Sequence, residues 1–406
     1  MATGIQFRDD PRFWRDVPEG APKQLGANIS VAGNHNRKLI LKTIRARGET
    51  TRLSIAAETG LTPPAIFKIS KDLVEEGLIV ASRASEKARG QPTSLVRLNP
   101  DAAYSLGLNI DRDHLTVVAV DFAGRVRFRL RRNIALADTG VVLTLMRETL
   151  DHLKGRHDLP LGRFVGLGVA VPDDQGPPER LSDFAGRPDA HIARALQKLT
   201  ELPVTLESDT ASAAIGELLF GTGLEANTFV YLYIGAGLGA GLVVNGQYIR
   251  GAHGRSGGIG ALPKVNLLKP SQTNLQKTLG DACLVSELLS RLAEAGHSLH
   301  DADASSLDPA VNPIVEDWIN RVADHLYLPM LNAICFIDPD RIVLGGDLPG
   351  PIAEPLCEVL SRRLSMHVGT HWPKRAVTAG RLVNDPAALG AASLALREMW
   401  EPSAKA

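Results

Sequence analysis

Apolar residues recur at helical spacing in two short runs within residues 49–79. In the second run Ile66, Ile69 and Leu73 follow one another at three- and four-residue intervals, so they would share one buried stripe. The small apolar face of the first run consists of Leu53, Ala56 and Ala57. Two helices of this length with a tight turn between them predict a helix-turn-helix, whose second helix enters a DNA major groove.

The ends of both helices carry residues that favour helix starts and stops. Thr51 and Thr62 are suited to N-caps, and Pro63 stands at a first helical position, where a missing N–H costs nothing. Gly60 sits where the chain would leave the first helix in a left-handed conformation, and Gly77 closes the second helix. These residues fix the bounds of the predicted motif.

Residues expected to contact DNA lie on the outward face of the second helix and in a basic turn after it. On the helix they are Thr62, Pro63, Pro64, Ala65, Phe67, Lys68 and Lys71. Ala65 and Phe67 stand where this motif often carries hydroxyls, so we expect apolar contact with a thymine methyl group. The turn at residues 83–92 carries a narrow tip that can lay an arginine in an A·T-rich minor groove. The residues of this tip are Arg89, Gly90 and Gln91.

Flanking elements complete a winged helix-turn-helix over residues 34–98. His35–Arg47 predicts a third helix, in which Ile40 and Ile44 form an i,i+4 pair and the basic residues stay in solvent. Those basic residues are Arg37, Lys38, Lys42, Arg45 and Arg47. Two strands of a hairpin follow, at residues 78–82 and 93–98. Such a domain is typical of DNA binding, and the alternatives are contacts with protein or RNA.

The remainder, residues 101–397, alternates strands with helices in two successive halves. The halves cover about residues 103–220 and 227–397, and each opens on a β-hairpin. This order predicts a duplicated α/β domain with a central cleft. Asn99, Pro100 and Asp101 form a short linker before it.

Charge and composition separate the two parts of the chain. The first 100 residues carry 16 Lys and Arg against 10 Asp and Glu, whereas the other 306 carry 29 against 35. A basic N-terminal region followed by an acidic region is typical of a polyanion-binding domain fused to a domain that does not bind polyanions. Residues 1–33 are rich in Pro, Gly and charge without periodicity and predict a mobile tail.

Three widely spaced cysteines, an odd number, favour a reducing cytosol over a disulfide framework. The N-terminal residues lack the apolar core of a signal peptide, and the longest apolar run, Phe229–Val244, is too short and too rich in Gly for a membrane span. We therefore expect a cytoplasmic protein that does not enter a membrane.

Four segments, in order behind the winged helix, resemble motifs of the ROK family (repressors, open reading frames and kinases). Residues 207–217 are similar to its catalytic-helix motif, and residues 235–241, GAGLGAG, to its second phosphate loop. Residues 251–260, GAHGRSGGIG, resemble the segment that supplies sugar ligands, and residues 338–346 resemble its adenosine motif. The resemblance covers residues 36–397. It implies a winged helix followed by a two-lobed, actin-like (ribonuclease H-like) sugar-kinase fold.

Departures from these motifs argue against catalysis. Where the kinases of the family carry an Asp-x-Gly-Gly-Thr turn that binds metal and phosphate, this chain has Asn109, then Asp111 and Asp113 on either side of Arg112. Two carboxylates there would repel a triphosphate, and Asn109 replaces the carboxylate expected near Mg²⁺. Ala236 stands where the kinases carry Thr. Phosphoryl transfer depends on positioning and charge neutralisation, so we expect no ATP-dependent catalysis, no catalytic residue and no cofactor.

The family's zinc segment is also altered. It would fall near Asn266–Cys283, where Cys283 is the one remaining Cys, and Ala261 stands at the position of the family's His ligand. One Cys cannot build a tetrahedral thiolate site, so we expect no bound metal. Cys283 is then expected to be a small buried hydrophobe.

Part of a sugar site remains. In the kinases the carboxylate at the position of Asp209 accepts the proton of a sugar hydroxyl, and here it can still accept hydrogen bonds from a polyol. Ser208 stands in for the usual Asn, and Gly258 for a sugar-binding Glu. These three residues are the expected effector contacts, and the alternative is that Asp209 is only a helix cap.

We therefore interpret the chain as a DNA-binding transcriptional regulator, a repressor of carbohydrate-metabolism genes controlled by a sugar or sugar derivative between the lobes. Its expected partners are operator DNA, this effector, and copies of itself in a homodimer or homotetramer. Two alternatives stay open: an ATP-dependent sugar kinase with a DNA-binding head, and a ligand-independent DNA-binding scaffold.

Overall fold

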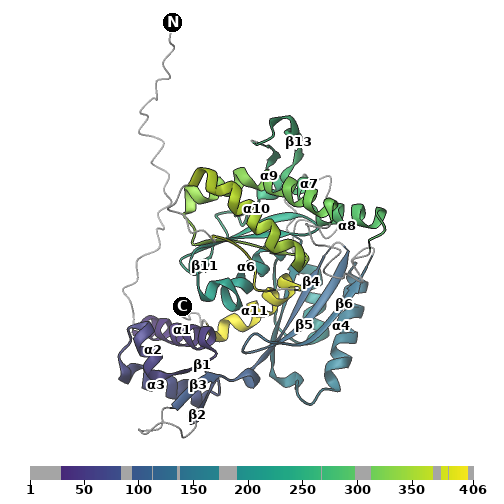
Figure 1. Ribbon diagram of the computed structural model, residues 1–406. Helices are drawn as coiled ribbons and strands as arrows, with labels where there is room; N and C mark the ends of the chain where they lie inside the picture. Colours follow the sequence, from purple (N-terminus) through teal and green to yellow (C-terminus); the bar gives the residue numbers. More distant parts are fainter. Residues whose placement is uncertain are drawn as a thin grey trace, which may run out of the picture.

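The computed structural model describes residues 29–83, 94–111, 113–134, 138–172, 190–266, 268–297, 312–368, 376–382 and 384–400. They form a winged helix and an α/β body of two lobes, and the C-terminal helix runs from the body toward the winged helix (Figure 1). The predicted fold class is confirmed. None of the helices in these ranges combines the length and the apolar character needed to span a bilayer.

The winged helix contains three helices and a three-stranded sheet. Its elements are α1 (Ile29–Arg47), β1 (Glu49–Thr51), α2 (Arg52–Thr59), α3 (Pro63–Glu75), β2 (Ile79–Arg83) and β3 (Ser94–Leu98). Strand β3 lies between β1 and β2 and is antiparallel to both. The strand β1 was not predicted, because three residues are too few to show alternation.

The helix ends behave largely as their residue types predict. Thr51 accepts a hydrogen bond from the Ser54 backbone N at 3.0 Å, and Gly60 ends α2 with φ of 68°. Gly77 follows α3 with φ of 74°. Thr62 has an extended backbone at the start of α3, but its side chain makes no cap hydrogen bond. Its hydroxyl is therefore not used by the helix.

Two details of the winged helix differ from prediction. Helix α1 begins at Ile29 rather than His35, so it includes the end of the segment predicted as a tail, and residues 1–28 lie outside the described ranges. The predicted apolar face of α2 is wrong for Leu53, which is 74% exposed, and for Ala57, whereas Ala56 packs against the core and Ile55 is the fully buried residue. Two helical positions differ by about 200° around the axis, so the side chains of Leu53 and Ile55 point to opposite sides.

Each lobe is built on a five-stranded sheet, and the two sheets share one order and one set of strand directions. Lobe one has the order β6-β5-β4-β7-β8, and lobe two has β11-β10-β9-β14-β15. The central strands β4 and β9 are each antiparallel to the next strand in the chain and parallel to the strand on the other side. Duplication of the α/β unit is therefore visible in the topology.

The strands of lobe one are β4 (Tyr104–Ile110), β5 (His114–Asp121), β6 (Val126–Asn133), β7 (Phe164–Val171) and β8 (Val204–Ser208). Its helices are α4 (Thr139–Lys154), α5 (Ala190–Thr200) and α6 (Asp209–Phe220). The strands of lobe two are β9 (Phe229–Ile234), β10 (Leu238–Val244), β11 (Gln247–Tyr248), β14 (Arg341–Gly346) and β15 (Val377–Ala379). Its helices are α7 (Leu279–Ala282), α8 (Val285–Glu294), α9 (Pro313–Ile337) and α10 (Gly350–Val368). A two-stranded sheet of β12 (Pro263–Lys264) and β13 (Asn274–Thr278) adjoins lobe two, and α11 (Pro386–Trp400) follows β15.

Helices α6 and α11 pack against each other, and each also packs against the sheet of the opposite lobe. Helix α11 lies so close to the lobe-one sheet that a Cβ on Gly168 would be 1.8 Å from the backbone oxygen of Ala391. Helix α6 lies against the lobe-two sheet at Gly241. Where the two helices meet, a Cβ on Gly390 would be 1.7 Å from the backbone oxygen of Ser212. Glycine is needed at such positions because only it permits this approach of backbones.

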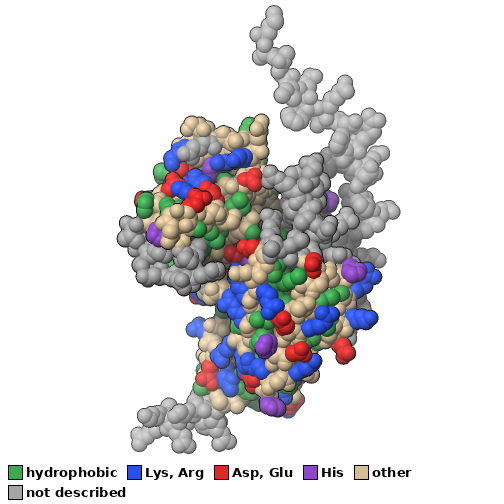
Figure 2. Space-filling model, turned by 90° about the vertical axis from the view of Figure 1, so that its right-hand side faces the viewer, with side chains coloured by type: hydrophobic (Ala, Val, Ile, Leu, Met, Phe, Trp, Pro, Cys, Tyr) green, Lys and Arg blue, Asp and Glu red, His purple; other side chains and the backbone are tan. Residues whose placement is uncertain are grey.

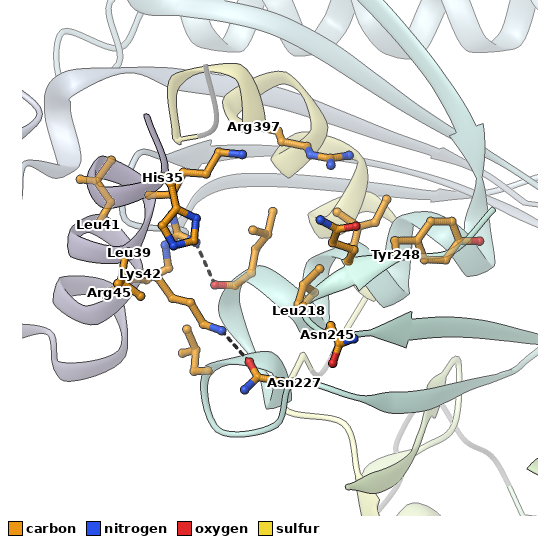
Figure 3. A pocket seen from close by; sticks show the side chains of 16 residues that line it. His35, Leu39, Leu41, Lys42, Arg45, Leu218, Asn227, Asn245, Tyr248 and Arg397 are labelled. Atoms are coloured by element: carbon orange, nitrogen blue, oxygen red, sulfur yellow. Dashed lines mark hydrogen bonds between the residues drawn. The ribbon is translucent and has the colours of Figure 1, made fainter. Parts of the chain in front are cut away.

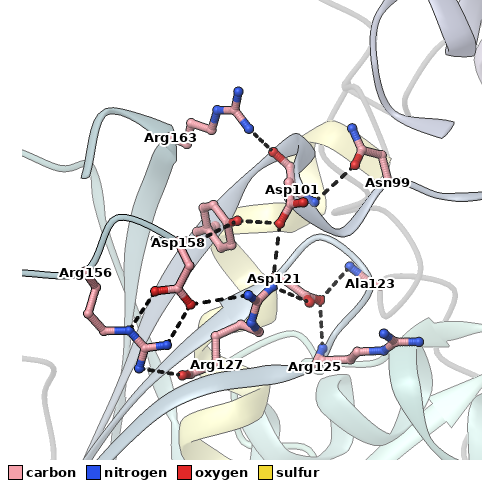
Figure 4. Close-up of polar contacts among 10 residues, drawn as sticks. Asn99, Asp101, Asp121, Ala123, Arg125, Arg127, Arg156, Asp158 and Arg163 are labelled. Atoms are coloured by element: carbon pink, nitrogen blue, oxygen red, sulfur yellow. Dashed lines mark hydrogen bonds and ion pairs between the residues drawn. The ribbon is translucent and has the colours of Figure 1, made fainter. Parts of the chain in front are cut away.

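The linker at residues 99–101 is fixed to lobe one by polar contacts (Figure 4). Tyr104 Oη donates a hydrogen bond to Asp101 Oδ1 at 2.6 Å, and Arg163 Nη1 donates one to the Asp101 backbone oxygen at 2.9 Å. Arg127 lies 3.5 Å from the Asp101 carboxylate and 3.6 Å from that of Asp121. These contacts therefore hold the linker in place where the chain passes from the winged helix to lobe one.

The face of lobe one formed by β6 and α4 carries basic and acidic side chains interspersed with one another (Figure 2). Strand β6 supplies Arg127, Arg129 and Arg131 at alternate positions, which places them on one side of the strand. No large area of a single charge is visible among the coloured side chains of this view. This face of the body therefore differs from a polyanion-binding surface.

Candidate functional site

The outward face of α3 brings together the residues predicted to contact DNA. Those exposed on it are Thr62, Pro63, Pro64, Phe67, Lys68 and Lys71, and Ala65 is half-buried. Ile66 and Leu73 on the opposite side are fully buried, as the stripe predicted. Phe67 is 60% exposed on this face and is free to contact a partner. Arg89, Gly90 and Gln91 lie outside the described residues.

Arg52 of α2 extends this face and was not predicted. Its guanidinium carbon lies 5.6 Å from the centroid of the Phe67 ring, within the range of a cation–π contact. Lys71 is paired with Glu75 at 3.6 Å, but both side chains are exposed and such a pair contributes little stability. The face thus offers an aromatic ring next to cationic groups.

Helix α1 attaches the winged helix to the body. Lys42 Nζ donates a hydrogen bond to Asn227 Oδ1 at 3.0 Å, and burial, then the charge of Arg45, lower the pKa of Lys42. Arg45 Nη1 donates to the Leu219 backbone oxygen at 3.3 Å, and its guanidinium lies 5.4 Å from the centroid of the Phe220 ring. The prediction that the basic residues of this helix stay in solvent is wrong for both, because α1 packs on the body as well as on α2 and α3.

A pocket of about 510 Å³ lies at this junction (Figure 3). Its walls come from α1, α6, the β10–β11 turn and the end of α11. The cationic residues among its lining are Lys38, Lys42, Arg45 and Arg397. Its volume falls within the range of small-molecule sites. Sequence reasoning missed this pocket because it forms only where two domains meet.

In the cleft between the lobes, Asp209 lies in a much smaller pocket of about 30 Å³, which Asp111, Tyr233 and the loop at residues 236–239 also line. Asp209 Oδ1 accepts hydrogen bonds from the backbone N and the hydroxyl of Thr210. This volume is far below the roughly 300–1,000 Å³ of typical small-molecule sites.

The cap of α6 is Ser208. Its Oγ accepts a hydrogen bond from the Ala211 backbone N at 3.2 Å, so the capping role considered for Asp209 belongs to the preceding residue. Gly258 begins a 3-10 turn beside β10 and, like Ser208, is not among the residues that line the Asp209 pocket. The three predicted effector contacts thus do not meet in one described pocket.

Helix α6 connects this cleft to the winged helix. Ile215 and Leu219 near its C-terminal end lie in one hydrophobic cluster with Ile40 and Ile44 of α1, and all four side chains are buried. A helix rises 1.5 Å per residue, so the ten residue steps from Asp209 to Leu219 span about 15 Å. One short, buried helix therefore reaches from the cleft to the DNA-binding domain.

Three ionisable side chains meet at the carboxyl ends of β4 and β14. Asp111, His114 and Asp347 each place a donor atom within 4.8 Å of those of the other two. His114 Nδ1 lies 2.7 Å from Asp113 Oδ1, and the Tyr233 hydroxyl donates to Asp347 Oδ2 at 3.3 Å. The first two residues belong to lobe one and Asp347 belongs to lobe two, so the cluster bridges the lobes.

Burial and neighbouring charge shift the protonation of this cluster. Burial, followed by the charge of Asp111, raises the pKa of Asp347 to about 7. Burial alone would lower the pKa of His114, but the hydrogen bond to Asp113 and the charge of Asp111 outweigh it and raise that pKa. The hydrogen bond to His114 in turn lowers the pKa of Asp113. Negative charge at this place therefore attracts protons or other cations.

Asp385, whose side chain has no exposed surface, holds the start of α11 to lobe one. It forms ion pairs with Arg129 and Arg131, the latter at 2.8 Å, and accepts a hydrogen bond from Thr116 Oγ1 at 3.0 Å. This contact joins residues 116 and 385, which are distant in sequence. It was not predicted, because nothing in the sequence places α11 on the lobe-one sheet.

The β4–β5 turn does not have the character of a phosphate-binding loop. Asp111 is 4% exposed and faces the pocket beside Ala236, and the carboxylate of Asp113 is engaged by His114. Asn109 is 1% exposed, and Arg112 lies outside the described residues. Phosphate sites present backbone N–H groups and cations, whereas this one presents carboxylates.

The segment that resembles the family's zinc site does not fit a zinc ion. Cys283 is fully buried among the hydrophobic residues of lobe two, and burial raises the pKa of its thiol to about 12. Asn266 is buried, and its Oδ1 accepts a hydrogen bond from the Lys269 backbone N at 2.8 Å. Within the described ranges, the one His/Cys/Asp/Glu group with metal-binding spacing is Asp111, His114 and Asp347.

Comparison with known proteins agrees with this architecture. Residues 106–398 match the ROK family, and residues 34–80 match winged helix-turn-helix DNA-binding domains. The chain is 26% identical over 239 residues to the xylose repressor of Caldicellulosiruptor bescii, covering 56% of this chain and 60% of that protein. It is 20% identical over 346 residues to the DNA-binding transcriptional dual regulator NagC of Escherichia coli, covering 81% of this chain and 84% of that protein.

Among solved structures, a ROK family transcriptional regulator described as a homolog of the E. coli MLC protein aligns with a TM-score of 0.65 and 20% identity, over 91% of this chain and 97% of that one. This similarity shows the fold. The family match covers most of the chain, so the protein belongs to the ROK family.

His114 and Asp347 were missed as site residues, although a signal for Asp347 exists. It follows Gly346 directly after a parallel strand, and α/β proteins bind ligands at the carboxyl ends of such strands. His114 follows Asp113 in a turn whose carboxylates were interpreted only as an obstacle to phosphate binding. The pairing of the two across the lobes required the three-dimensional structure.

Proposed function

We propose that this chain is a DNA-binding transcriptional regulator that represses carbohydrate-metabolism genes and responds to a sugar or sugar derivative. The xylose repressor and NagC are regulators of the same family, and this chain has both of the corresponding domains. One observation carries the proposal: α6 begins at Asp209 in the cleft and ends in the hydrophobic cluster that holds α1. A ligand at one end is thereby coupled to the winged helix at the other.

The effector acts by changing the separation of the lobes. Asp209 and Asp111 of lobe one and Tyr233 and residues 236–239 of lobe two line a pocket of about 30 Å³, so under this proposal an opened state is required to admit a sugar. A ligand that binds one state better shifts the population toward it. The shift moves α6 and changes the orientation of α3 within a homodimer or homotetramer, and hence the fit to two DNA half-sites.

DNA binding uses α3 in the major groove, with Lys68 and Lys71 near phosphates and Phe67 against a thymine methyl group. Arg89, in the segment between β2 and β3, is proposed to reach the adjacent minor groove. The protein then works in the cytoplasm, where its operator is. This assignment follows from the exposure and the charge of the α3 face.

The alternative of an ATP-dependent sugar kinase is disfavoured by the carboxylates of the β4–β5 turn. Asp111 lies beside Ala236, where a kinase requires groups that neutralise a triphosphate. We therefore assign no catalytic residue. ATP with Mg²⁺ is expected neither to raise the melting temperature nor to be converted to ADP with any sugar, and sugar-dependent ADP release that disappears in Asp209→Asn would establish the kinase.

A selection experiment tests the regulator. The full chain is used to enrich binding sites from random DNA, and affinity for the enriched site is measured by fluorescence anisotropy with pentoses, hexoses and N-acetylated hexosamines added separately. We expect one enriched motif and at least one sugar that changes affinity by about 5-fold or more. Failure to enrich any motif, or a sugar that binds without changing DNA affinity, would overturn the proposal.

A further inference from the structure

The cluster of Asp111, His114 and Asp347 has the donor atoms and the spacing of a metal site. A His114 ring nitrogen and one oxygen of each carboxylate lie within 4.8 Å of one another. Ligand atoms on a tetrahedral zinc ion are roughly 3.3–3.6 Å from one another, so side-chain movements of about 1 Å bring all three onto one ion. We propose that these residues bind a divalent transition-metal ion at the base of the cleft.

The hydrogen bonding of His114 supplies independent support. The side chain is 2% exposed, and its Nε2 atom is buried without a hydrogen-bond partner among the described residues. Its other nitrogen, Nδ1, lies 2.7 Å from Asp113 Oδ1. Metal-bound histidines characteristically give one nitrogen to a carboxylate, which fixes the ring and leaves the other nitrogen for the ion. Asp113 and His114 have this arrangement.

Asn109 adds a further unsatisfied group on the same strand. It precedes Asp111 by two positions, is 1% exposed, and neither its amide nitrogen nor its amide oxygen has a partner within the described part of the chain. Buried polar atoms without partners are rare in folded proteins and require an explanation.

The donor set indicates the class of metal. The imidazole suits Zn²⁺, and two carboxylates also suit Mn²⁺, whereas Mg²⁺ is bound mainly by oxygen ligands and water. The site is separate from residues 261–283, where the sequence shows that the family's zinc ligands are missing. It departs from the expectation of a protein without metal, which rested on that segment and on Asn109 in place of a carboxylate near Mg²⁺.

The proposed ion would have ligands from both lobes. Asp111 and His114 come from the β4–β5 turn of lobe one, and Asp347 follows β14 of lobe two. A bound ion therefore joins the two lobes at the base of the cleft. The inference concerns the cleft itself and does not depend on DNA binding or on the identity of the sugar.

The test is metal binding by the full chain after treatment with EDTA, measured by calorimetric titration with Mn²⁺ and with Zn²⁺ in the absence of DNA and sugar. We expect one ion per chain. His114→Gln and Asp347→Asn should weaken binding by more than about tenfold, and Asp113→Asn by about 10–100-fold, because it removes the carboxylate that orients His114. His157→Gln, on an exposed histidine of the same lobe, and Cys283→Ala are the controls and should bind as the wild type does.

Metal-free melting temperatures distinguish a defect in binding from a defect in folding. Asp347→Asn keeps the shape of the side chain and an acceptor for the Tyr233 hydroxyl while removing one of two neighbouring carboxylates, so the metal-free variant should be at least as stable as the wild type. If His114→Gln does not fold, metal binding by Asp347→Asn decides the test. Absence of stoichiometric binding by the wild type, or an ion retained at unchanged affinity in Asp347→Asn, would overturn the proposal.

Discussion

Arg45 of α1 donates a hydrogen bond to the backbone oxygen of Leu219, the penultimate residue of α6. The last carbonyl groups of a helix have no partner within it, and a cation near them also interacts favourably with the helix dipole. The guanidinium group thus attaches the winged helix to the end of the one helix that starts at Asp209. Movement of α6 cannot leave α1 unaffected unless this hydrogen bond breaks.

Lys68→Ala and Lys71→Ala are expected to weaken DNA binding across sequences. Both side chains are exposed on α3, and removing one phosphate interaction should flatten the slope of log affinity against log salt by about 0.9. The measurement is a titration of the enriched DNA site at several salt concentrations. Lys154→Ala, an exposed lysine of lobe one, is the control. Unchanged slopes in both α3 variants would show that this helix does not face DNA.

Phe67→Ala is expected to reduce sequence discrimination rather than general affinity. The ring is 60% exposed, so its removal should change the free energy of unfolding by less than about 0.5 kcal/mol. If the ring meets a thymine methyl group, replacing that thymine by deoxyuridine weakens binding of the wild type but not of the variant. Equal reductions in the two proteins would place Phe67 elsewhere in the complex.

Much of this fold could be predicted because its signals are local. Phe164–Val171 and Phe229–Ile234 are continuous apolar runs, which mark strands buried on both faces, and both are strands in the structure. The stripe of Ile66 and Leu73 likewise follows from helical spacing. Failures arose where burial depends on distant residues: Leu53 is exposed, and Arg45 contacts the body.

The candidate sites divide in the same way. The α3 face was accessible from one helix, whereas the group formed by Asp111, His114 and Asp347 joins residues more than 200 positions apart across two lobes. The pocket beside Lys42 depends on how α1 packs against the body. Sequence patterns indicate which face of a helix or strand is buried, but they do not show which other element packs against it. Both of these sites are formed by residues from elements that pack against each other.

Gly390→Ala is expected to destabilise the body. A Cβ there would lie 1.7 Å from the Ser212 backbone oxygen, where α11 crosses α6, and a rigid backbone cannot move aside cheaply. Overpacking of this kind costs about 1–3 kcal/mol. Gly162→Ala is the matched control, since its Cβ would meet nothing within 4 Å. Melting temperatures from calorimetry compare the two, and equal values would contradict the close crossing of α6 and α11.

The last prediction separates ligand binding from the transmission of its effect along α6. Asp209→Ala should abolish the effector response while leaving operator affinity without effector nearly unchanged, because the winged helix is a distinct unit. A site that hydrogen-bonds hydroxyl groups depends strongly on each polar partner. Asp209→Asn should be milder, since it keeps an acceptor and removes only the charge. Asp151→Ala, on an exposed carboxylate of lobe one, is the control.

Arg45→Ala should give the complementary result. It leaves the cleft intact, so sugar binding measured by calorimetry should match the wild type, but removing the hydrogen bond to Leu219 should reduce the change in DNA affinity that the sugar produces. DNA titrations with and without sugar compare the three proteins. If Asp209→Ala responds to the effector as the wild type does, the ligand binds elsewhere. The basic pocket at the junction of α1 and α6 is then the first alternative site. Arg45 lines this pocket, so a sugar that binds there would bind more weakly to Arg45→Ala.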